Sequence, residues 1–126
     1  MLDRGFLVLC AVVWLPYGAV CFFDSSVLVD SAGVMANSAT GASEIRAMYG
    51  GLQGAVGALA TIALFRPTLV QSFLVTLLTL SAGLLSARVA GYFLDGGYTG
   101  YTGIAIGFET VLLSSSLYFL YIRRIH

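Results

Sequence analysis

The chain has 126 residues, of which 59% are hydrophobic and only 10% are charged. Soluble chains average about 25% charged residues, and a soluble fold of this length could not bury so much apolar surface. The composition therefore indicates an integral membrane protein with a single transmembrane domain, residues 1–126. The six basic residues are all arginines and are balanced by six acidic ones, so no basic cluster suggests a nucleic-acid partner.

The first apolar run covers residues 5–23. About 20 residues at ~1.5 Å each cross the ~30 Å hydrocarbon layer, so this run predicts a membrane-crossing helix. Arg4 precedes it as in a signal peptide, but the run is longer than the usual apolar core of such a peptide. Pro16 lies inside the run, and we expect it to kink the helix.

An outer loop is predicted at 24–43, where Ser, Ala, Gly and Asn are frequent. Its apolar residues between Val27 and Met35 would suit a short segment on the membrane surface or the mouth of the bundle. The second helix is predicted at 44–65, with Thr40 and Ser43 as alternative N-caps.

The third and fourth helices are predicted at 68–94 and 102–122. Pro67 fits the first turn of the third helix, where its missing N–H costs nothing, and the residues after Leu94 are turn formers. One long and two short connections predict an all-α, up-down-up-down four-helix bundle. The arginines outside the apolar runs lie on one side, so the positive-inside rule places both termini in the cytoplasm. These arginines are Arg4, Arg66, Arg123 and Arg124.

Small residues recur at helical spacing and predict faces where neighbouring backbones approach closely. In the second and fourth predicted helices the packing candidates are Gly50, Gly54, Gly57, Gly103 and Gly107. In the third predicted helix they are Ala82, Ser86 and Ala90.

Polar residues inside the predicted helices converge on the outer half of the bundle. A charge at mid-membrane costs about 2.5–3.5 kcal/mol on insertion scales, so such residues face the interior and pair. The preferred predicted ion pair is Arg88 with Glu109. The second candidate is Glu44 with Arg46 or Arg88. The full candidate ionic or ligand cluster is Glu44, Arg46, Tyr49, Gln53, Arg88, Tyr92, Asp95 and Glu109.

Two interpretations of this cluster stay open. It is either an ionic latch that fixes helix register, or a small outer-leaflet cavity whose arginines hold a polar head group while Glu109 exchanges a proton. No catalytic set accompanies it, because the serines at 114–116 have no histidine or lysine partner. His126 is the only histidine, and Cys10 and Cys21 are too far apart on one helix to pair. We therefore expect no enzyme activity, no metal and no cofactor.

The motif Glu44-Ile45-Arg46-Ala47-x-Tyr49-Gly50-Gly51, together with Arg88-x-x-Gly91-x-x-x-Asp95-Gly96 and Glu109, resembles the bacterial membrane protein family called domain of unknown function 4345. The resemblance implies a four-span fold and a bacterial inner-membrane location, and it supplies no activity. A looser similarity to DoxX-like four-helix membrane proteins implies a link to quinone-dependent oxidoreductases.

These observations favour a small inner-membrane accessory or assembly subunit that packs against other membrane proteins or a second copy. The alternative is a module that binds or transports a lipid, a quinone or a small anion. A quinone-linked redox complex subunit is a third hypothesis, supported only by the DoxX-like similarity.

Overall fold

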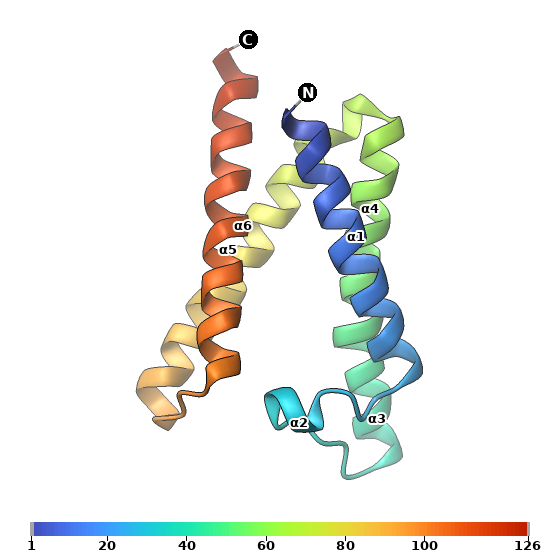
Figure 1. The fold of residues 1–126 in the computed structure, drawn as a ribbon, viewed down its shortest axis with the longest axis vertical. Helices are drawn as coiled ribbons and strands as arrows, with labels where there is room; N and C mark the ends of the chain where they lie inside the picture. The colour runs from blue at the N-terminus through green and yellow to red at the C-terminus, as the bar shows by residue number, and fades with distance from the viewer. Residues whose placement is uncertain (1, 126) are drawn as a thin grey trace. The chain divides into compact units, whose positions relative to one another are not determined.

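The computed structural model describes the backbone of residues 2–125 and the side chains of residues 3–124. Within these residues the chain is helical apart from turns and short connections (Figure 1). The helical elements are α1 (Leu2–Phe23), α2 (Val29–Ala32), α3 (Ala39–Ile45), the π-helical segment η1 (Arg46–Gly51), α4 (Leu52–Phe65), the 3-10 turn η2 (Pro67–Leu69), α5 (Val70–Asp95) and α6 (Gly100–Ile125).

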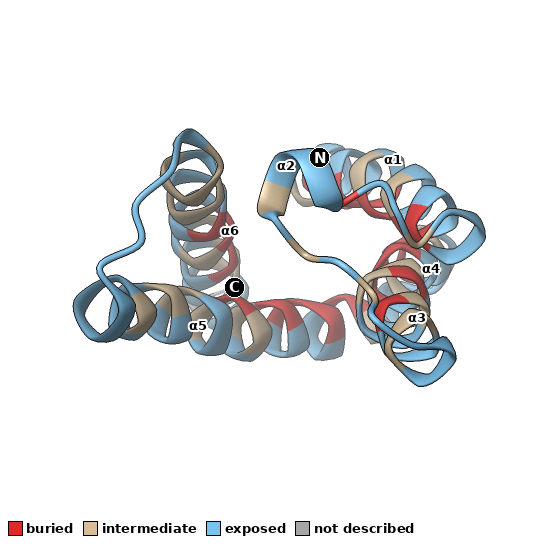
Figure 2. Ribbon diagram, turned by 90° about the horizontal axis from the view of Figure 1, so that it is seen from below, coloured by how far each residue is buried: buried red, intermediate tan, exposed pale blue. Residues whose placement is uncertain are grey.

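Four stretches of this chain are long and apolar enough to cross a membrane: Asp3–Phe23, Ala39–Phe65, Pro67–Asp95 and Gly100–Arg124. The all-α fold with four candidate membrane-spanning helices is therefore as predicted. Buried positions lie on one side of each long helix, and intermediate and exposed positions cover the rest (Figure 2). Many of the exposed residues are large and apolar, such as Val12, Phe65 and Val111, as lipid contact requires.

The second membrane helix begins at Ala39, earlier than the predicted start at residue 44. Its N-cap is Ser38, whose Oγ accepts a 3.0 Å hydrogen bond from the backbone N–H of Gly41. The alternatives Thr40 and Ser43 were both wrong, because the apolar pattern used to place the helix starts only after its polar first turn. The predicted outer loop is therefore shorter, and it contains the single-turn helix α2.

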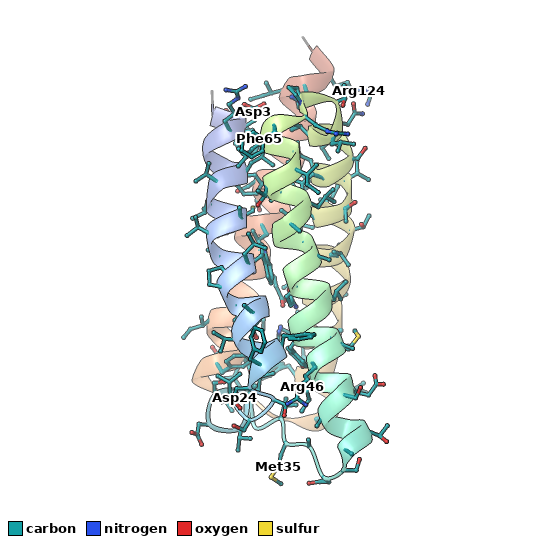
Figure 3. The ribbon with its side chains drawn as sticks, turned by 90° about the vertical axis from the view of Figure 1, so that its right-hand side faces the viewer. Asp3, Asp24, Met35, Arg46, Phe65 and Arg124 are labelled. Atoms are coloured by element: carbon teal, nitrogen blue, oxygen red, sulfur yellow. The ribbon has the colours of Figure 1, made fainter. Side chains whose placement is uncertain are left out.

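The chain divides into two compact units, Met1–Val70 and Gln71–His126. In the first unit α1 runs antiparallel to the helix formed by α3, η1 and α4. Figure 3 places Asp3 and Phe65 at one end of this pair and Asp24 and Arg46 at the other. The prediction of one transmembrane domain, with both units in a single bundle, stays a prediction.

Glycines allow the backbones of α1 and of the η1–α4 helix to touch. A Cβ added at Gly57 would lie 2.7 Å from the backbone nitrogen of Leu15, and one at Gly50 would lie 2.7 Å from Cα of Phe22. On α1, a Cβ at Gly18 would lie 2.7 Å from Cα of Gly54. Distances this short leave no room for a methyl group, so these glycines are required by the packing.

The end of the first unit nearest Asp24 is closed by an apolar core. Its buried residues are Cys21, Leu28 and Ile45, one from α1, one from the loop and one from α3. The partly buried residues that pack against them are Tyr17, Ala32, Val34, Ala36 and Tyr49. The loop is thus anchored to the helix ends by hydrophobic contacts.

In the second unit α5 and α6 are antiparallel and joined by a short connection (Figure 1). Gly96 follows α5 with a φ of 68°, and its N–H bonds to the carbonyl of Tyr92 at 3.2 Å. A residue in the left-handed backbone conformation commonly ends a helix, and glycine adopts this conformation without steric cost.

The two packing glycines predicted in α6 have different surroundings. A Cβ at Gly103 would meet the hydroxyl of Tyr98, whereas a Cβ at Gly107 would meet no atom of the described residues within 4 Å.

Replacing Gly57 with alanine is expected to destabilise the first unit by about 1–3 kcal/mol, the usual cost of overpacking. Gly54→Ala is the matched control, because no atom of the described chain lies within 4 Å of the added Cβ. The measurement is unfolding in mixed micelles of increasing denaturing-detergent fraction. Equal loss of stability in the two variants would contradict the packing described here.

Candidate functional site

The second unit contains an ion pair within the membrane-spanning segments. Nε of Arg88 in α5 donates to Oε1 of Glu109 in α6 at 2.7 Å. The Arg88 side chain is 28% exposed and that of Glu109 only 5%. The contact predicted from helix spacing is therefore present. It joins two antiparallel helices inside a region where an unpaired charge would be costly.

Tyr101 in α6 completes the surroundings of the arginine. The guanidinium carbon of Arg88 lies 5.7 Å from the centroid of the Tyr101 ring, close enough for a cation–π attraction. Tyr101 was absent from the predicted cluster. The sequence did contain a signal for Tyr101. This residue precedes Glu109 by eight residues, about two helical turns, and so lies on the same side of the helix.

The ion pair leaves hydrogen-bonding capacity unused. Oε2 of Glu109 is buried and has no hydrogen-bond partner among the described residues. The two terminal nitrogens of an arginine carry four further N–H groups beyond Nε–H. The arrangement is therefore a single charge-assisted contact rather than the two-fold fork that arginine and carboxylate can form.

Arg46 was expected to pair with Glu44, but the structure shows otherwise. Nε of Arg46 donates to the carbonyl oxygen of Phe22 at 2.9 Å. That carbonyl belongs to the last turn of α1, where backbone acceptors lack a helical partner and a cation is electrostatically favoured. Glu44 is exposed and makes no ion pair with any arginine in the described part of the chain. Arg46 therefore caps α1.

The motif that begins the second membrane helix coincides with a local change in helix type. Residues Arg46–Gly51 form a π-helical segment, in which the turn is widened. Gly50 at this segment packs against the backbone of Phe22. Arg46 and Gly50 thus both contact Phe22 in the final turn of α1.

The other members of the predicted cluster have separate surroundings within their own units. Tyr49 packs in the apolar core of the first unit, and Gln53 is half-buried in α4. Tyr92 is 45% exposed and lies edge-on to the rings of Phe93 and Tyr98, and Asp95 is exposed at the end of α5. Within the second unit the structure therefore brings Arg88 and Glu109 together. That the candidates of the first unit join them stays a prediction.

Asp24 caps the connection after α1. Its Oδ1 accepts hydrogen bonds from both the backbone N–H and the hydroxyl of Ser26, at 2.9 and 2.6 Å. These bonds, with the positive charge of Arg46 as a smaller cause, hold the pKa of the exposed Asp24 carboxyl below its ordinary value.

No group of three or more His, Cys, Asp or Glu side chains that could hold a metal ion is present among the described residues. Cys10 and Cys21 are both buried free thiols.

The family model described as domain of unknown function (DUF4345) matches residues 2–120. The chain belongs to this family. The match includes the π-helical segment, the Arg88–Glu109 pair and Tyr101, so each feature described above lies inside the family region. No curated protein and no solved structure matches the chain.

Breaking the ion pair by Arg88→Met is expected to destabilise the protein by about 3 kcal/mol, because it leaves a buried carboxylate without its partner. The double variant Arg88→Met/Glu109→Leu should lose less than the sum of the two single losses, with a coupling of about 1–3 kcal/mol. Unfolding in mixed micelles gives the free energy of unfolding of the wild type, the two single variants and the double variant. Additive losses would show that the contact contributes nothing to stability.

The Asp24 cap gives a pH prediction. A carboxyl whose folded-state pKa is depressed contributes stability above its unfolded pKa, and this contribution is lost as pH falls through the folded value. The backbone amide shift of Ser26 in an NMR titration should therefore change with a midpoint below the ordinary Asp value of 3.8. Asp24→Asn should abolish this titration. A midpoint at or above the ordinary value would contradict the cap.

Proposed function

We propose that this protein is a non-enzymatic accessory or assembly subunit of a membrane complex, and that it packs against a transmembrane helix of another protein. The observation that supports this proposal is an exposed row of small and hydroxyl residues along α5. The row, called here the α5 stripe, consists of Ser72, Thr76, Thr79, Gly83, Ser86 and Ala90.

The spacing of the α5 stripe alternates between four and three residues. A repeat of 3.5 residues keeps one seam of a helix facing a partner helix along its whole length. In lipid, small residues favour such contacts because they allow helices to approach closely, and apolar surface alone gives no driving force. The α5 stripe therefore has the pattern of a helix-packing face and not of a lipid-facing one.

The chemistry of the α5 stripe also suits a flat contact. The hydroxyls of Thr79 and Ser86 bond to backbone carbonyls of their own helix, Val75 and Ala82 respectively, so they present carbon to a neighbour. No atom of the described residues lies within 4 Å of a Cβ added at Gly83. Gly57 of α4 is packed against α1, whereas the space beside Gly83 is open to a partner.

The same proposal includes the membrane arrangement. The two units are expected to form one up-down-up-down bundle in a bacterial inner membrane, with both termini in the cytoplasm. This orientation is supported by the arginines Arg66, Arg123 and Arg124, which follow or end the apolar helices on the predicted inner side.

A photocrosslinking amino acid placed at position 79 tests the accessory role in native membranes. It should crosslink to one defined membrane protein. Gly83→Leu should abolish that product by adding bulk to the α5 stripe, whereas Leu84→Phe should retain it because residue 84 lies off the stripe. The crosslinked partner is identified by mass spectrometry.

Two outcomes would contradict the proposal. Crosslinks to lipid alone would leave the α5 stripe as ordinary lipid-facing surface. A product that contains only two copies of this chain would replace the accessory role with self-association.

A second candidate function is a module that binds a lipid, a quinone or a small anion. It is favoured by the partial exposure of Arg88 and by its additional N–H donors. Native mass spectrometry of gently extracted protein should then show a bound small molecule that is lost in Arg88→Ala and retained in Arg123→Ala. Its retention in both variants would reject Arg88 as the binding residue. A quinone-linked redox role stays a prediction.

A further inference from the structure

The buried polar side chains of the described residues all lie in the second unit. They are Ser81 in α5 and Glu109 and Ser116 in α6, exposed by 2%, 4% and 0% respectively. In the first unit the buried side chains among the described residues are aliphatic, aromatic or thiol groups, and none carries a hydroxyl or a carboxylate. A concentration of polar atoms in one helix pair requires a local explanation, because buried polar groups in lipid cost free energy unless they are hydrogen-bonded.

These residues are evenly spaced along the two antiparallel helices. Arg88 pairs with Glu109. Ser81 precedes Arg88 by seven residues and Ser116 follows Glu109 by seven residues, so each is two helical turns from its end of the ion pair. Because α5 and α6 run in opposite directions, both serines lie on the same side of the ion pair. A polar strip therefore continues from the ion pair along the two helices.

Two atoms of this strip lack hydrogen-bond partners among the described residues, namely Oε2 of Glu109 and Oγ of Ser116. Other helix hydroxyls satisfy themselves: those of Thr61 and Thr110 donate to the carbonyls of Gly57 and Ile106, four residues earlier. The fully buried Ser116 makes no such bond. An ionised carboxylate accepts but cannot donate, so Oε2 requires a donor, while the serine hydroxyl can do either.

We propose that about two or three water molecules lie along α6 between Glu109 and Ser116, and that Glu109 is a proton-exchanging carboxylate. The spacing of the two residues corresponds to about 10 Å along the helix, which a single water cannot bridge with hydrogen bonds of about 2.8 Å. Water is small and uncharged, and it both donates and accepts, so it matches both unpartnered atoms.

The exchange step follows from these contacts. A hydronium in the water file transfers a proton to Oε2, so one O–H bond breaks in the hydronium and one forms on the carboxyl. The charged and titratable groups that face Glu109 in the second unit are Arg88 from α5 and, beyond it, Tyr101 from α6. Proton uptake changes the net charge of the ion pair from zero to +1. The electrostatic attraction between α5 and α6 is thereby weakened.

Water-edited solid-state NMR on the labelled full chain in lipid bilayers tests this inference. Magnetisation from water should reach the carboxyl carbon of Glu109 and Cβ of Ser116 much faster than it reaches Ile45, which is also buried, at 6% exposure, but lies in the apolar core of the first unit. The Glu109 carboxyl shift should also respond to buffer pH. The accessory role is tested separately, because it depends on the α5 stripe.

Ser116→Ala should slow water transfer to Glu109, and Ser114→Ala, an exposed position on the same helix, should leave it unchanged. Transfer no faster than at Ile45, or a carboxyl shift that does not respond to pH, would overturn the proposal and leave a dry ionic latch. Slow water transfer together with contacts from Glu109 to lipid carbons would instead show that a lipid hydroxyl occupies the site. That outcome also overturns the water file.

Discussion

The absence of water in the bilayer is the constraint on which the rest of this structure depends. A polar group within the spans costs free energy unless it finds a hydrogen-bond partner. Arg46 finds such a partner at the end of α1, where it meets the carbonyl of Phe22. Arg88 does so by contacting Glu109 on the next helix. Each arginine thus fixes one helix of its own unit to another, and each contact is stabilising because the unpaired alternative in lipid is costly.

The two units use different means to hold their helices together. In the first unit glycines at positions 18, 50 and 57 bring backbones into direct contact, and an apolar core closes one end. In the second unit apolar residues such as Phe73 and Leu77 are buried too, and an ion pair between long side chains joins α5 to α6, with an aromatic ring over the guanidinium. Close-packed backbones respond to added volume, and an ion pair responds to charge. Proton uptake by Glu109 would therefore act on the second unit and leave the glycine contacts of the first unit unchanged.

Much of the fold was predictable from the sequence, because run length and apolar composition determine which segments can cross a membrane. The turn at Pro67 and the contact between Arg88 and Glu109 followed from similarly local rules. Local rules did not predict the start of the second helix or its Ser38 cap, because the helix begins with a polar turn. They did not predict the π-helical segment either, because that segment goes with tertiary contacts to Phe22. Arg46 was assigned to the wrong partner because sequence spacing does not show that a neighbouring helix ends beside it.

A rotational-echo NMR distance between Nε of Arg88 and the carboxyl carbon of Glu109, in the full chain in lipid bilayers, tests the central claim most directly. The account predicts strong dephasing, consistent with the 2.7 Å separation of Nε and Oε1. It also predicts that the dephasing disappears in Glu109→Gln when the same carbon position is observed, because the charge that holds the arginine is gone. Absence of dephasing in the wild-type chain would mean that α5 and α6 are held by something else, and the ion pair would not organise the second unit.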